Sequence, residues 1–211
     1  GQNWDEGIIT GPNGTLQVKE VRGRNDIIHS LDLEHQLEVG DEIIGEIDWE
    51  RRYSHMRMHT AQHLVSGIAY ELFNGVRTVG NQIHTTHSRI DFNPISFNEE
   101  MLEQLTNETN NMIEQNLEVT DLTLTRNEIN SIMPPERTNM DLIPEFIEQL
   151  RVVKIGDEID LCPCAGTHIS NIGEIGEISI ISKKSKGKGT QRITYELSES
   201  NSPRNFNSSI I

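Results

Sequence analysis

The sequence has few of the residues that would assign it to several common classes of protein. Its 211 residues include only two cysteines, too few for a disulfide framework. Both flank Pro163, so they are too close for an ordinary bridge and are expected to be reduced. No apolar run approaches the roughly 18–20 residues of a membrane span, and no signal peptide is visible. We therefore expect a cytoplasmic protein with no membrane partner.

Basic residues are also scarce, because 18 lysines and arginines stand against 33 acidic residues and give a net charge of −15. This charge repels a phosphate backbone, so the chain is not expected to coat nucleic acid unselectively or to bind DNA. A local basic patch can still overcome the repulsion. Residues 181–192 contain no acid and carry Lys183, Lys184, Lys186, Lys188 and Arg192. Taken alone, this segment predicts a solvated strand-turn-strand.

Histidine and cysteine recur in two short motifs of equal spacing. His59 and His63 lie four residues apart, as do Cys164 and His168. On a helix, positions i and i+4 lie on one face, so both histidines of the first pair can reach one ion. Thiolate and imidazole are the ligands that zinc favours. The two motifs therefore predict one zinc ion per chain, held by these four residues.

The first motif departs from the zinc-protease pattern at one position. Such a protease carries a glutamate directly after the first histidine as general base, and position 60 is threonine here. The bond attacked is therefore expected to be an ester rather than an amide, unless another group handles the proton. Two further residues compete as ligands. His55 precedes His59 by four residues, and Cys162 precedes Cys164 by two.

Hydrophobic periodicity and turn residues predict an α+β fold. Short β-like runs over residues 7–10, 15–21, 26–33 and 41–49 predict a small barrel-like subdomain. An amphipathic helix over residues 53–73 carries the first histidine pair. Later runs predict two strands within 77–92, a helix over 98–116 capped by Ser96 or Asn98, a strand over 119–125, a short helix from 127, and strands over 152–155, 175–182 and 192–197.

Six short segments form an ordered pattern along the chain. They are Trp-Glu-Arg-Arg at 49–52, His-Met-Arg-Met-His-Thr-Ala-Gln-His-Leu at 55–64, Gly-Asn-Gln-Ile at 80–83, Ser-Arg-Ile-Asp-Phe at 88–92, Cys-Ala-Gly-Thr-His at 164–168 and Gly-Glu-Ile-Gly at 173–176. Together they resemble the editing domain of alanyl-tRNA synthetase, and specifically the free-standing AlaX family. Residues 1–7 are similar to the start of that family's N-terminal β-rich subdomain, and some native residues before them are expected to be missing.

The resemblance implies a domain organisation and an activity. It implies a β-barrel-like subdomain over residues 1–50, a zinc-containing α/β editing domain with a mostly antiparallel sheet over 51–198, and a flexible tail over 199–211. The implied enzyme is a zinc-dependent hydrolase that deacylates mischarged Ser-tRNA(Ala), and also Gly-tRNA(Ala). The family pattern favours His59 with His63 as ligands. By their positions in matching segments, Thr60 and Gln82 are expected to contact the serine hydroxyl.

The resemblance also gives the basic segment a partner. The cations of residues 183–192, together with Arg57 and with His84 at the end of a pocket-lining strand, are expected to receive the acceptor end of mischarged tRNA(Ala). Two other functions remain open. One is a non-catalytic tRNA-binding module with a structural zinc, and the other is a zinc hydrolase of another small ester or amide. Four protein ligands would close the tetrahedron, so the sequence leaves the role of zinc open.

Overall fold

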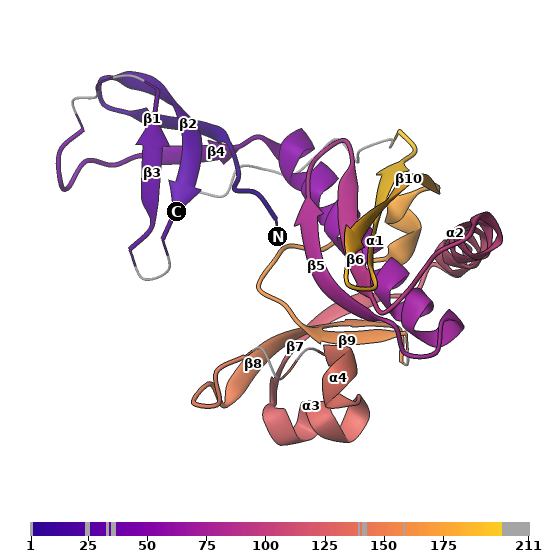
Figure 1. Ribbon diagram of the computed structural model, residues 1–211. Coiled ribbons are helices and arrows are strands. Elements are labelled where there is room, and N and C mark those ends of the chain that lie inside the picture. Colours follow the sequence, from indigo (N-terminus) through magenta and orange to yellow (C-terminus); the bar gives the residue numbers. More distant parts are fainter. Residues whose placement is uncertain are drawn as a thin grey trace. The chain divides into compact units, whose positions relative to one another are not determined.

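The protein has the α+β fold that the sequence predicted, and the strands of its described residues form three antiparallel sheets (Figure 1). The computed structural model describes residues 2–23, 26–32, 34, 37–138, 140, 143–157 and 159–199. Its contacts form two compact units. Asn3–Ser54 belong to one unit, and Gln2 joins His55–Ser200 in the other. Beyond Glu199, the tail predicted from the sequence lies outside the described residues. Among the helices described, none is long and apolar enough to cross a bilayer.

The N-terminal unit contains a four-stranded antiparallel sheet in the order β3-β2-β1-β4. The strands are β1 (Gly7–Gly11), β2 (Gly14–Arg22), β3 (Ile28–Leu31) and β4 (Ile44–Ile47). Ile9 and Val18 are its buried aliphatic side chains. In the part of the unit that is described, β3 and β4 are both edge strands. The expected barrel-like arrangement is thus an open sheet here.

Helix α1 (Trp49–Leu72) links the two units and carries the first histidine pair. It begins four residues earlier than the sequence predicted, because the Asp48 carboxylate accepts a hydrogen bond from the backbone N–H of Arg51 and caps the first turn. The middle of the helix is buried among apolar neighbours, with Ala61, Leu64 and Val65 fully inaccessible. Polar residues in this stretch therefore need partners inside the protein.

The central sheet has the strand order β10-β11-β6-β5. Its strands are β5 (Arg77–Ile83), β6 (Ser88–Asn93), β10 (Ile178–Gly187) and β11 (Thr190–Leu197). Ile90, Ile193 and Tyr195 are buried on the face toward α1, and the Tyr195 hydroxyl donates to the Met58 carbonyl at 2.7 Å. The residues that alternate with these along each strand lie on the opposite face of the sheet. Strand β10 runs five residues beyond its predicted end, so most of the basic segment is strand and the turn is short.

Strand β5 contains a bulge at Val79. Thr78 lies opposite Phe92, whereas Gly80 lies opposite Asp91, so two residues of β5 advance the ladder by a single step. The bulge changes which side chains share a face. Thr78 and Asn81 both point toward α1, although strict alternation would separate two residues three positions apart.

A third sheet and the remaining helices complete the second unit. The sheet has the order β7-β8-β9, with β7 (Val119–Thr125), β8 (Gln149–Ile155) and β9 (Asp160–Pro163). The helices are α2 (Glu99–Glu114), α3 (Arg126–Ile132), α4 (Pro135–Thr138) and the 3-10 helix η2 (Ile172–Ile175). As predicted, the Asn98 side chain caps α2. Strand β9 was not predicted, and it leads directly into the second metal motif.

Candidate metal centre and adjoining cavity

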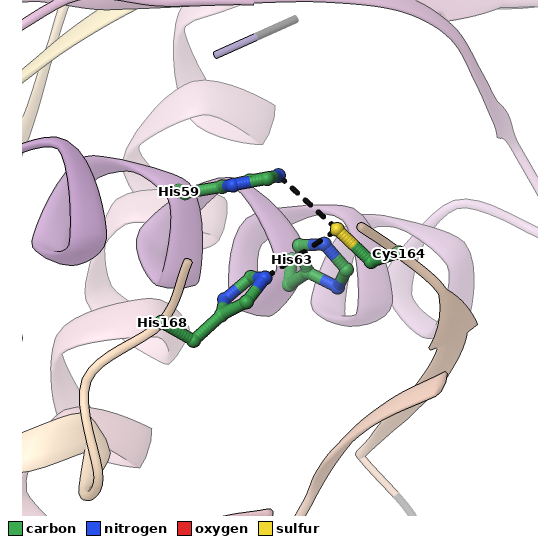
Figure 2. Close-up of side chains that lie close together, drawn as sticks. All are labelled: His59, His63, Cys164 and His168. Atoms are coloured by element: carbon green, nitrogen blue, oxygen red, sulfur yellow. Dashed lines mark hydrogen bonds between the residues drawn. The ribbon is translucent and has the colours of Figure 1, made fainter. Parts of the chain in front are cut away.

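The two sequence motifs meet at one point (Figure 2). His59 and His63 project from α1, and Cys164 and His168 come from the loop after β9. The potential ligand atoms of the four residues lie within 4.8 Å of one another. Within this group, the Cys164 Sγ lies 3.6 Å from the His59 Nε2 and 3.5 Å from the His168 Nε2. The four side chains could therefore hold one metal ion.

The spacing of these atoms fits a tetrahedral ion. Metal bonds of about 2.05 Å to nitrogen and about 2.3 Å to sulfur, at tetrahedral angles, would hold the sulfur and nitrogen roughly 3.5 Å apart. The two measured separations agree with that value. Three imidazoles and one thiolate also form a donor set that suits zinc. The residues present thus suit such an ion in both donor type and spacing.

Each histidine of the group has its second ring nitrogen fixed by a partner. The three contacts join His63 Nδ1 to Asp160 Oδ2 at 2.8 Å, His59 Nδ1 to Gln2 Oε1 at 2.8 Å, and His168 Nδ1 to Thr60 Oγ1 at 3.1 Å. Holding Nδ1 in this way directs Nε2 toward a common centre, as in protein metal sites with carboxylate or carbonyl partners. Asp160 and Gln2 were not anticipated, since they lie far from the histidines in sequence.

The electrostatics of the group favour metal ligation by a thiolate. Burial raises the pKa of Cys164, but hydrogen bonds from His168, His59 and His63 outweigh it and lower the pKa to about 2. Burial lowers the pKa of His168 to about 4 and also lowers that of His59, so both imidazoles are neutral ligands. Burial opposes the charge of His63, yet the Asp160 carboxylate raises its pKa to about 10. Metal binding must therefore displace a proton from His63.

The two competing ligands lie outside the group. Cys162 is two residues from Cys164, but burial, with Asp160 and Cys164, raises its pKa well above the ordinary value, so it stays a neutral thiol. His55 is fully buried on the preceding turn of α1 and is not among the four converging residues. The loop reaches the helix closely because of Gly166. A Cβ there would come within 2.1 Å of the His59 ring, so no larger residue fits without displacing this ligand.

A cavity of about 540 Å³ adjoins the ligand group, a size typical of small-molecule sites. Its α1 wall follows helical spacing and consists of His59, Gln62, His63, Ser66, Gly67 and Tyr70. The β5 wall is formed by Thr78 and Asn81, and the opposite wall by residues from α4 to the Cys164 loop. Residues at i, i+3, i+4 and i+7 from the first histidine share one face, so this periodicity could have identified Gln62 and Ser66 from the sequence.

A small polar network lines the cavity beside the ligands. Gln62 Nε2 donates to Ser66 Oγ at 2.9 Å, and Thr78 Oγ1 donates to the same oxygen at 2.7 Å. The Asn81 amide donates to Gln62 Oε1 at 3.2 Å. These residues form the polar wall nearest to the metal group, and none of them was among the predicted contacts. They offer donors and acceptors to a small polar ligand.

The two predicted catalytic contacts lie elsewhere. Thr60 is fully buried, and its hydroxyl donates to the Met56 carbonyl while it accepts from the Ile169 N–H. It also holds His168 and does not line the cavity, so its placement favours a supporting role. Gln82 lies opposite Arg89, on the sheet face away from α1. The Val79 bulge is the reason, because it brings Asn81 rather than Gln82 to the cavity.

The residues predicted to bind substrate occupy several different environments. Arg57 is only 6% exposed, and its guanidinium donates to the carbonyls of Glu174, Ile175 and Ser198. This placement favours a structural role over contact with RNA. His84 is half-buried at the end of β5, and its ring stacks on that of His87 with 5.2 Å between centroids.

Most of the predicted basic patch lies along strand β10. Lys183, Lys184, Lys186 and Lys188 are all exposed, and the Lys183 ammonium donates to the Phe97 carbonyl at 3.0 Å. Arg192, on β11, makes a two-fold ion pair with Asp91 on β6, with N–O distances of 2.6 and 2.8 Å. Within the part of the chain that the structure describes, the segment therefore combines cations that have no side-chain partner with one that is tethered and one that is paired.

Comparisons with known proteins agree on one family. Residues 150–194 match the family described as threonyl and alanyl tRNA synthetase second additional domain. The chain is 37% identical to the alanyl-tRNA editing protein AlaX-M of Saccharolobus solfataricus, over 92% of this chain and 81% of that protein. It is 32% identical to AlaX-M of Methanosarcina mazei, over 93% and 81%.

Longer relatives contain the same region within a larger chain. AlaX-L of Pyrococcus horikoshii is 31% identical over 92% of this chain and 47% of its own length. The alanine–tRNA ligase of Thermococcus kodakarensis is 30% identical over 94% of this chain and 22% of its own length. These relatives confirm the resemblance seen in the ordered sequence segments. The chain belongs to the AlaX family of alanyl-tRNA editing proteins.

Proposed function

We propose that the protein is a zinc-dependent deacylase that hydrolyses the ester bond of mischarged Ser-tRNA(Ala), and also of Gly-tRNA(Ala), in trans. The relatives named for alanyl-tRNA editing support the reaction. The observation that carries the proposal is the cavity of about 540 Å³ that lies against the His/Cys group and has a polar wall. Its partner is the acceptor end of tRNA(Ala).

The polar wall suits the discrimination that such an enzyme must achieve. A pocket built for alanine cannot strongly reject serine, because one added hydroxyl changes the binding free energy by only about 1–3 kcal/mol. A second site that hydrogen-bonds the hydroxyl can discriminate by roughly 10⁴-fold, since alanine leaves the polar groups of that site unpaired. We assign this contact to Thr78 and Asn81, which face the cavity beside Gln62.

The four ligand residues fix the place of the scissile ester relative to this wall. We infer that the ion they hold is zinc, one per chain. When bound, zinc supplies a Lewis acid that can polarise an ester carbonyl. His59 and His63 hold their orientation through Gln2 and Asp160, so the chain presents a rigid wall to the substrate. The absence of a glutamate at position 60 agrees with an ester substrate rather than a peptide.

The test compares three aminoacyl-tRNAs with the purified protein. Ser-tRNA(Ala) is expected to lose its amino acid faster than the uncatalysed rate by at least tenfold, Gly-tRNA(Ala) also to be hydrolysed, and Ala-tRNA(Ala) to be spared. Equal rates on seryl and alanyl substrates would remove the editing proposal. A protein that binds tRNA and zinc but hydrolyses none of the three would be a binding module with a structural metal.

A further inference from the structure

The face of the central sheet that points away from α1 is rich in cations. Lys184 lies opposite Arg192, and Arg192 lies opposite Asp91. Arg89 is two residues before Asp91 on β6, so it lies on the same face of the sheet. We call this surface the open face. Its cations are Arg77, Arg89, Lys184, Lys186 and Arg192, and its acids are Asp91 and Glu196. A local excess of positive charge therefore stands out in a chain with a net charge of −15.

Three of these cations are unpaired within the described residues. Arg89, Lys184 and Lys186 make no hydrogen bond or ion pair there, and the Nε atom of Arg89 is buried without a partner. The charge of Lys186 contributes to lowering the pKa of Asp91, so the two side chains lie on the same surface. Unpaired cations gathered on one side of a sheet create a positive potential, which attracts a polyanion.

A pair of stacked imidazoles borders the open face at the β5–β6 hairpin. The His84 and His87 rings lie 5.2 Å apart and are inclined by 27°. Burial, His87 and Arg89 together lower the pKa of His84, so that ring is neutral at physiological pH. Imidazole rings can stack on unpaired nucleobases, whereas the cations beside them suit phosphates. The surface thus has the groups that an RNA strand requires.

Strand β5 connects this surface with the cavity. It is an edge strand of the central sheet, and its residues alternate between the two sites apart from the bulge. Asn81 faces the cavity, while its neighbour Gln82 lies on the open face beside Arg89. A flexible single strand that passes over this edge would join a backbone bound on one side to an ester bound on the other.

We propose that the open face binds the phosphate backbone of the tRNA acceptor arm, with the single-stranded 3′ end crossing β5 into the cavity. This inference rests on the proposed function. The proposed binding surface differs from the tip of the hairpin formed by β10 and β11. Lys183 has the parity of buried Ile193 and is tied to the Phe97 carbonyl, and Lys188 lies in the turn. Neither residue belongs to the open face.

A matched pair of double variants separates the two surfaces. Arg89→Ala with Lys184→Ala removes two charges from the open face, and Lys183→Ala with Lys188→Ala removes two from the rest of the hairpin. Binding of fluorescein-labelled, uncharged tRNA(Ala) is measured by anisotropy over a salt series. We expect about tenfold weaker binding and a salt slope lower by about two for the open-face pair, and less than a threefold change for the other. Equal losses in the two pairs would overturn the assignment.

A third variant should improve binding, which a misfolded protein cannot do. Asp91→Asn removes the central acid of the open face and releases Arg192 from its ion pair. We expect several-fold tighter binding of tRNA(Ala), and unchanged or weaker binding would refute the proposal. Hydrolysis of Ser-tRNA(Ala) by the wild-type protein is followed separately. Failure there counts against the proposed function, whereas normal hydrolysis with no change in variant binding counts against the surface alone.

Discussion

The two faces of the central sheet differ in whether their polar side chains have hydrogen-bond or ion-pair partners. On the face toward α1, Thr78 and Asn81 are linked to helix residues, and the ligand imidazoles beyond them are fixed by further hydrogen bonds. On the other face, within the described chain, Arg89 and Lys184 have no partner. The first arrangement preorganises a site for a small ligand, and the second leaves charge available for a large one. In the two proposals made above, one face of the sheet therefore serves hydrolysis and the other serves tRNA binding.

The largest expected effect comes from breaking the ligand group on the α1 side. Cys164→Ala should lose nearly all bound zinc, and hydrolysis of Ser-tRNA(Ala) with it, because a thiolate ligand disappears from a four-residue site. Cys162→Ala is the matched control and should keep its metal, since Cys162 lies outside the group. Metal per chain by mass spectrometry gives the answer. If Cys162 proved indispensable for zinc, the assignment of the second motif would be wrong.

The next prediction tests the hydrogen bond by which Asp160 orients the ligand His63. Asp160→Asn leaves His63 in place but removes the charge that holds its Nδ1–H. Zinc affinity should fall by about 10–100-fold, as is usual when a partner of a ligand histidine is lost. Competition with a chromophoric chelator measures the affinity directly. Unchanged affinity would mean that Asp160 serves only the packing of β9.

A third prediction compares neighbouring residues on opposite faces of β5. Asn81→Ala removes a donor from the cavity and should lower kcat/KM for Ser-tRNA(Ala) by about tenfold, equivalent to one hydrogen bond of about 1.4 kcal/mol. Gln82→Ala alters the open face and should change kcat/KM by less than threefold. Steady-state deacylation rates distinguish the two variants. A larger loss for Gln82→Ala would favour the residue that the sequence indicated.

The smallest effect concerns how the ion pair between Asp91 and Arg192 on the open face changes the stability of the folded protein as the pH falls. The Arg192 guanidinium lowers the pKa of Asp91 below its ordinary 3.8. A lowered folded-state pKa stabilises the protein above the unfolded-state pKa, and this stabilisation is lost as the pH falls through the folded-state value. Wild type should therefore be modestly more stable than Asp91→Asn at pH 7, and the two should converge once the pH falls below the folded-state pKa of Asp91. Urea unfolding over a pH series from 7 into acid tests this, and a difference that persists in the most acidic samples would contradict it.

The sequence was most informative where its signals were local. The α+β class, the capped start of α2 and the AlaX family followed from periodicity, capping residues and ordered segments, and the four-residue ligand group follows the spacing of its two motifs. Gln2 and Asp160 were missed because their contacts with the histidines span long distances in sequence. The bulge at Val79 was also missed, since a single extra residue in a strand leaves no clear trace in a pattern of alternation.

That bulge also has a consequence for how the family can vary. The bulge holds one extra residue of β5 between Thr78 and Gly80, so deleting Val79 should remove the bulge and leave Asn81 opposite Ile90, still facing the cavity. An insertion or deletion that no bulge absorbs would instead exchange the side chains that face the cavity with those that face the open face, because residues alternate between the two faces. The length of β5 can therefore change by one residue at Val79 without moving Asn81, whereas the same change elsewhere in the strand would alter substrate preference and RNA contact together.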